Sequence, residues 1–104
     1  MTSMAKRLAY TVGTEGGGRL SCAFPLDPRT RSPEQVGEVA VALVETLDHE
    51  ARVSGLANGD MLQALAIALA LRVGMMEGDT DENTELADAL VQEALAAVRA
   101  RARG

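Results

Sequence analysis

Residues 60–77 read DMLQALAIALALRVGMME, and apolar side chains lie on nearly every side of the helix that this pattern predicts. With about 100° of rotation per residue, Met61 and Leu65 fall in one sector, whereas Ile67 and Ala70 fall in the opposite one. A helix that is apolar on all sides is normally a buried helix. We therefore expect residues 60–77 to form the central helix of the fold, covered by the rest of the chain.

Signals on either side of this segment predict two further helices. The tetrapeptide Ser32–Gln35 supplies an N-cap serine, a proline at the first helical position and the glutamine of a capping box, and Gly55 is a suitable C-terminal stop. After residue 77, Gly78–Thr80 breaks the chain and begins a third helix that runs to about Arg101. Acidic residues crowd its first turns and arginines its last turns, as the helix dipole favours.

Two runs near the N-terminus alternate between apolar and polar side chains, as half-buried β-strands do. The apolar positions of the two runs are Leu8, Tyr10 and Val12, and Leu20, Cys22 and Phe24. A glycine-rich loop, residues 13–18, joins them, and a connector with two prolines follows through residue 31. The pattern predicts a β-hairpin with one apolar face.

Together these segments predict a mostly α fold of the α+β class, in which an N-terminal β-hairpin precedes a three-helix bundle with a central apolar helix. We expect one domain over residues 1–104, with the hairpin and connector in residues 1–31 and the bundle in residues 32–104. Because one hairpin and two helices can cover only part of this apolar surface, we also expect a homodimer or a higher oligomer.

The charge of the chain is unevenly distributed. The net charge is −5, but residues 1–31 carry +3, residues 32–95 carry −11, and residues 96–104 add three arginines. Apolar residues at 47% argue against disorder. The longest unbroken apolar run, residues 64–71, is too short to cross a bilayer, and a single cysteine suits a reducing compartment. We expect a cytoplasmic protein that does not bind membranes.

The sequence contains no pattern that indicates catalysis or a cofactor. Residues 13–18 have the glycine spacing of a phosphate-binding loop, but the lysine and the Ser/Thr that contact phosphate and Mg²⁺ are missing. Cys22 lies on the predicted apolar face of the hairpin, so we interpret it as a small buried hydrophobic residue. We therefore expect a protein that is not an enzyme and that carries no cofactor.

Glu45 and His49 are the one candidate metal-binding pair. They are four residues apart on the polar side of the first predicted helix. Since a functional site needs three or four ligands, metal-dependent activity requires two such pairs to meet across a dimer. The alternative is a solvated helix face on which Glu45 faces His49 and Asp48 faces Arg52.

Arg72 is the one basic residue within the apolar segment 60–77. In one interpretation its charged end reaches solvent from the last turns of the helix, where the dipole also favours a cation. In the other, it forms an ion pair with an acid on a neighbouring helix or subunit and fixes their register.

Our leading functional hypothesis is a non-catalytic module for protein–protein interaction, of the adaptor or inhibitor type, that self-associates and binds a basic protein partner. Acidic residues on one side of a helix steer basic partners. The acidic surface comprises Glu34, Glu38, Glu45 and Asp48. The apolar contact surface comprises Met61, Leu65, Leu69, Arg72, Met75 and Met76.

The second hypothesis is a regulator that binds nucleic acid through the basic ends of the chain. The basic residues are Lys6, Arg7, Arg19, Arg29 and Arg31 near the N-terminus, and Arg99, Arg101 and Arg103 near the C-terminus. The net charge of −5 and the scarcity of aromatic residues argue against it. Metal-dependent activity at Glu45 and His49 is the third hypothesis.

Overall fold

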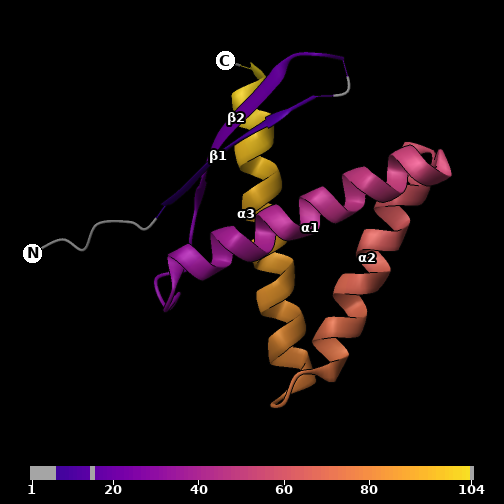
Figure 1. Ribbon diagram of the computed structural model, residues 1–104. Helices are drawn as coiled ribbons and strands as arrows, with labels where there is room; N and C mark the ends of the chain where they lie inside the picture. Colours follow the sequence, from indigo (N-terminus) through magenta and orange to yellow (C-terminus); the bar gives the residue numbers. More distant parts are fainter. Residues whose placement is uncertain (1–6, 15, 104) are drawn as a thin grey trace, which may run out of the picture. The chain divides into compact units, whose positions relative to one another are not determined.

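A computed structural model describes residues 7–14 and 16–103, without the side chains of residues 102 and 103. Two strands precede three helices along the chain (Figure 1). The elements are β1 (Arg7–Gly13), β2 (Arg19–Pro25), α1 (Pro33–Ser54), α2 (Asn58–Met75) and α3 (Thr80–Arg103). This order confirms the predicted mostly α fold, with an N-terminal hairpin followed by three helices of which the middle one is the apolar helix.

The two strands pair antiparallel, and their apolar residues share one face. Across the ladder, the pairs are Leu8 with Phe24, Tyr10 with Cys22, and Val12 with Leu20. These six side chains are half-buried or buried, whereas their neighbours along each strand are exposed. Cys22 is 8% exposed, and it is the one buried hydrophobic residue among those described, which confirms its predicted environment.

The loop between the strands is closed by its own hydrogen bonds. The backbone N–H of Thr14 donates to the carbonyl oxygen of Gly18 over 2.9 Å, and the N–H of Gly18 donates to the Thr14 hydroxyl over 3.0 Å. Gly17 has a φ of 90°, a left-handed conformation that costs glycine little. Residue 15 of the predicted glycine-rich loop lies outside the described residues.

α1 begins and ends where the sequence predicts. Pro33 occupies its first position, where the missing N–H of proline costs no helical hydrogen bond. The helix ends at Ser54, and Gly55 follows with a φ of 65° while its N–H donates to the carbonyl oxygen of Ala51 over 2.9 Å. A glycine in this conformation is a common way to end a helix.

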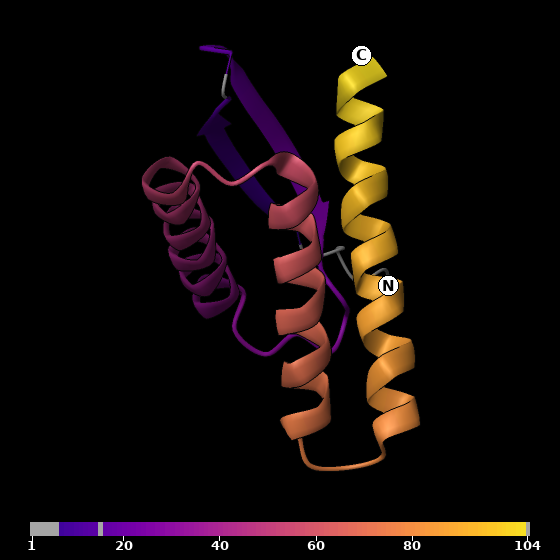
Figure 2. The same cartoon turned by 90° about the vertical axis from the view of Figure 1, so that its right-hand side faces the viewer.

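α2 and α3 are joined by a short connection, visible in Figure 2. α2 begins at Asn58, two residues before the predicted start, because Ala57 is extended and its carbonyl oxygen already accepts the N–H of Met61. The Asp79 carboxylate accepts the N–H groups of Asp81 and Glu82, 2.8 and 3.2 Å away. This is an N-cap, and it confirms the predicted start of α3.

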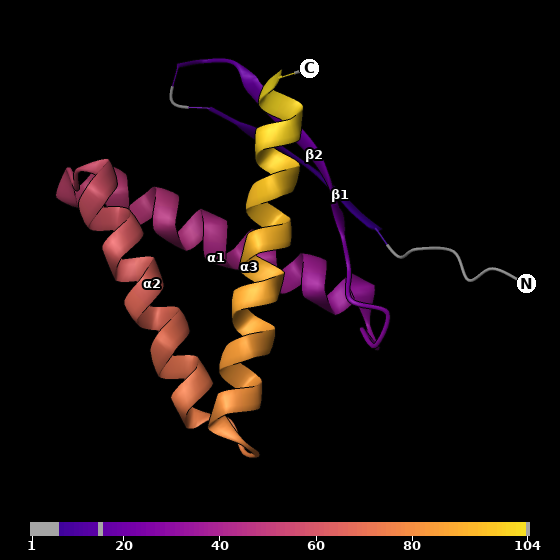
Figure 3. The same ribbon diagram turned by 180° about the vertical axis from the view of Figure 1, so that it is seen from behind.

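The chain divides into two compact units, Met1–Glu34 with Asp88–Gly104, and Gln35–Ala87. In the first unit, the hairpin lies beside the C-terminal part of α3 (Figure 3), and a guanidinium nitrogen of Arg101 donates to the carbonyl oxygen of Arg19 over 3.1 Å. This hydrogen bond connects two residues that are distant in sequence and both basic.

The second unit, Gln35–Ala87, contains no buried residue. The expectation that the apolar helix is covered on every side is therefore wrong for the single chain, since no residue of α2 is buried. The physical reason is a shortage of covering elements, because this unit offers α2 only α1 and the first turns of α3. Extensive backbone contact between described elements is confined to the pairing of β1 with β2.

Candidate interaction surfaces

The predicted acidic surface lies along α1, and its four carboxylates are exposed. Asp48 forms an ion pair with Arg52 over 2.9 Å, one helical turn later, as the spacing predicts. No described residue forms an ion pair with Glu38 or Glu45. These two carboxylates therefore remain open to a basic partner from solution.

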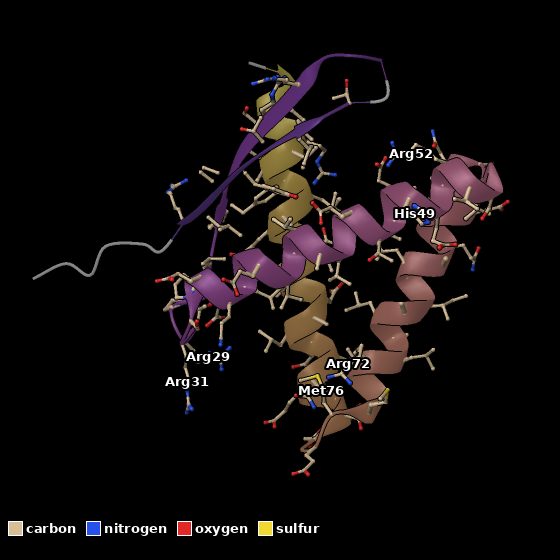
Figure 4. The ribbon with its side chains drawn as sticks, viewed as in Figure 1. Arg29, Arg31, His49, Arg52, Arg72 and Met76 are labelled. Atoms are coloured by element: carbon tan, nitrogen blue, oxygen red, sulfur yellow. The ribbon has the colours of Figure 1, made fainter. Side chains whose placement is uncertain are left out.

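His49 is exposed on α1 near Arg52 (Figure 4). Within residues 7–14 and 16–103, no three His, Cys, Asp or Glu side chains lie close enough together to hold a metal ion. A site that combines Glu45 and His49 needs a second chain, as the sequence already implied. The metal-dependent hypothesis stays an untested prediction.

The predicted apolar contact surface on α2 is open to solvent. Leu65, Leu69, Met75 and Met76 are exposed, and Met61 is half-buried. Their accessibility follows from the scarcity of covering elements in the second unit. Several large exposed apolar residues on one helix are typical of an association surface.

Arg72 lies at the C-terminal end of α2, on the same helix as Met75 and close to Met76 in Figure 4. Its side chain is exposed, and one guanidinium nitrogen lies 3.9 Å from the Met75 sulfur. No ion pair joins Arg72 to an acid among the described residues. The ion pair that fixes register with a neighbouring subunit stays a prediction.

Sequence reasoning missed exposed apolar residues on more than one side of α2. Leu62, Ile67 and Leu71 are among the more exposed large apolar residues of the helix, and none of them was assigned to the contact surface. For Leu71 the available signal was the spacing of residues 61, 64, 68, 71 and 75, which repeats every three and four residues as the seam of a coiled coil does.

The basic residues of the first unit are only partly free. In the connector before α1, Arg29 and Arg31 are both labelled in Figure 4. Arg29 pairs with Asp27 over 3.0 Å, and this side-chain hydrogen bond, with a second from the Arg29 backbone N–H, holds the pKa of the Asp27 carboxyl below its ordinary value. The same carboxylate raises the pKa of the Arg29 guanidinium.

The two basic clusters predicted at the chain ends meet at one point in this unit, where Arg101 bonds to the carbonyl oxygen of Arg19. Arg7 and Arg99 are exposed. Lys6 and the side chain of Arg103, which also belonged to the predicted basic clusters, lie outside the described residues.

None of the described helices combines the length and the apolar character needed to cross a membrane. No protein-family model matches the chain, and no curated protein or solved structure matches it. Function is therefore inferred from the surfaces of the described residues.

Proposed function

We propose that this protein is a non-catalytic, self-associating interaction module, of the adaptor or inhibitor type, that presents the acidic side of α1 to a basic protein partner. The observation that carries the proposal is the second unit, Gln35–Ala87, which exposes large apolar residues on its helices and buries none. The proposal places the protein in the cytoplasm, where its single thiol stays reduced.

The energetics of this unit favour association. Ordering the backbone costs roughly 1–2 kcal/mol per residue, and burial of a Leu, Ile or Met side chain returns about 1.5–3 kcal/mol. The apolar residues of α1 and α2 are largely exposed, so most of this stabilisation is unused in the single chain. Contact with another protein surface supplies it.

Electrostatics favour a basic partner. Glu38 and Glu45 are exposed and form no ion pair with a described residue, in a stretch of chain, residues 32–95, whose net charge is −11. Charges of one sign on a surface accelerate association with an oppositely charged partner, and salt screens them within about 8–10 Å at physiological strength. Binding through this surface weakens as salt rises.

The test is a titration of isotopically labelled protein with an oligolysine peptide, followed by NMR. We expect shifts centred on Glu38 and Glu45, and weaker binding at higher salt. We expect the double substitution Glu38→Lys and Glu45→Lys to lower the affinity for oligolysine several-fold. The control is the double substitution Glu82→Lys and Glu85→Lys, which changes the charge equally at the start of α3 and should lower this affinity less. Equal losses for the two pairs, or shifts centred on α3, contradict the proposal.

A second candidate function, nucleic-acid binding through the basic chain ends, is favoured by one contact. The hydrogen bond from Arg101 to the carbonyl oxygen of Arg19 brings two arginines from the predicted basic clusters to one place in the first unit. When arginines neutralise the phosphates of a nucleic acid, the binding affinity falls steeply as the salt concentration rises. A gel-shift experiment at low salt tests this candidate, and the absence of any complex removes it.

A further inference from the structure

One side of α2 carries a regular apolar seam. It comprises Met61, Ala64, Ala68, Leu71 and Met75. The spacings alternate between three and four residues, which keeps all five on one side of a helix. Met61 is half-buried, the two alanines are exposed, and Leu71 and Met75 are 62% and 69% exposed.

We propose that this seam is the self-association surface, and that α2 pairs with α2 of a second copy in antiparallel orientation about a two-fold axis at the level of Ala66. The inference rests on the proposed function and specifies its self-association. In this register, Met61 lies at the level of Leu71 of the second copy, and Ala64 lies at the level of Ala68. Both copies make the same contacts, as a two-fold interface requires.

The sizes of the seam residues suit this register. The small side chains of Ala64 and Ala68 meet at the middle of the helix, where they allow the two backbones to approach closely. Met61 and Leu71 then meet at both ends of the contact and fill the wider space there. α2 has 18 residues and is about 27 Å long, so the seam runs along most of the helix.

The charges of α2 favour the antiparallel orientation. Asp60 in the first turn and Arg72 in the last turn are the two charged residues of the helix, and neither forms an ion pair with a described residue. The charges and the four seam residues at 61, 64, 68 and 71 are symmetric about Ala66, so Asp60 of one copy lies at the level of Arg72 of the other. A parallel pair instead places acid at the level of acid and base at the level of base, which is unfavourable, as is the parallel alignment of two helix dipoles.

Directed disulfide formation tests the register, in a Cys22→Ala background that removes the native thiol. Ala64→Cys and Ala68→Cys proteins are mixed under reducing conditions and then oxidised. We expect the mixed dimer to dominate, because residues 64 and 68 lie at the same level, whereas two residues 64 are about 6 Å apart along the helix axis. Ala66→Cys is the control. Residue 66 lies at the level of the two-fold axis but on the side of α2 opposite the seam, so this variant should not cross-link.

Three results would overturn the proposal, two from cross-linking and one from sedimentation. Dominant cross-links of Ala64→Cys with itself indicate a parallel pair, and efficient cross-linking of Ala66→Cys indicates the opposite side of α2. If sedimentation shows that the protein stays monomeric up to high concentration, the pairing of α2 with α2 is excluded. Something other than a second copy then covers the seam.

A matched pair of substitutions tests the surface without cysteines. Leu71 lies in the seam and Leu62 lies on the other side of α2, and they are 62% and 65% exposed. We expect Leu71→Glu to raise the dissociation constant of the dimer by about tenfold or more, and Leu62→Glu to leave it nearly unchanged. The reverse order contradicts the proposal. The same variants are also titrated with oligolysine. A loss of self-association can then be distinguished from a loss of binding to the basic partner.

Discussion

The guanidinium of Arg101 donates a hydrogen bond to the backbone carbonyl oxygen of Arg19, 3.1 Å away and 82 residues earlier in the chain. It links the end of α3 to the first residue of β2 within one unit. Arg19 contributes only its backbone, so this contact depends on the arginine at position 101 and on the strand being formed.

Substitution Arg101→Ala therefore lowers the stability of the first unit modestly. One hydrogen bond at an exposed site contributes about 0.5–1.5 kcal/mol, which corresponds to a fall of several degrees in the melting temperature of a domain of this size. Thermal unfolding followed by circular dichroism measures it. Arg99→Ala is the control, since Arg99 is exposed on the same helix. An equal effect of the two substitutions contradicts the role of the hydrogen bond.

Gly17→Ala should destabilise the hairpin through the backbone alone. The φ of Gly17 is 90°, and a Cβ added there meets nothing within 4 Å, so strain rather than a clash sets a cost of about 1–2 kcal/mol. Gly16 is also in open space but has no positive φ, and Gly16→Ala should be neutral or slightly stabilising. Chemical denaturation of the two variants compares them, and equal costs argue against backbone strain.

Asp79→Ala should destabilise α3 by about 0.5–2 kcal/mol, because the N–H groups of Asp81 and Glu82 lose their acceptor. Asp79→Asn keeps an acceptor oxygen at the N-cap and should retain most of the stability. Urea unfolding gives both values. If the asparagine variant loses as much as the alanine variant, the cap hydrogen bonds are not the source of the effect.

The pair of Asp27 and Arg29 gives a pH-dependent contribution to stability. The pKa of Asp27 is lowered from 3.8 in the folded chain, so the contribution is present above this value and is lost as the pH falls through the lower folded pKa. Titration of the Asp27 carboxyl carbon by NMR should give a midpoint below 3.8. In Arg29→Ala the midpoint should move up towards the ordinary value, and an unchanged midpoint contradicts the assignment.

Local signals predicted most of the fold. Pro33, Gly55 and Asp79 mark helix ends through their own backbone or side-chain chemistry, and the alternation of apolar residues gave both strands and the buried face of the hairpin. The start of α2 was placed two residues late because its N-cap is Ala57, which has no side-chain acceptor, while Asn58, a residue type that favours the N-cap, already lies inside the helix. The complete covering of α2 by its own chain was predicted wrongly, since hydrophobicity indicates which side chains favour burial but not which surface is near enough to bury them.

For the candidate surfaces too, contacts within one element were predictable, whereas contacts between elements were not. Asp48 and Arg52 are one turn apart on one helix, so their ion pair follows from spacing alone. The contact of Arg101 with Arg19 does not, because it joins a helix to a strand across most of the chain. The exposure of Leu71 was missed, although an exposed contact surface was predicted on another side of α2.

The burial of Cys22 gives the molecule an internal reporter. It is the one cysteine of the chain, and it is 8% exposed at the centre of the hairpin, opposite Tyr10. A thiol reagent can therefore modify the native protein only when the hairpin opens, and the alkylation rate under native conditions measures the free energy of that opening. Local unfolding of the strands becomes measurable separately from the melting of the helices, without any added label.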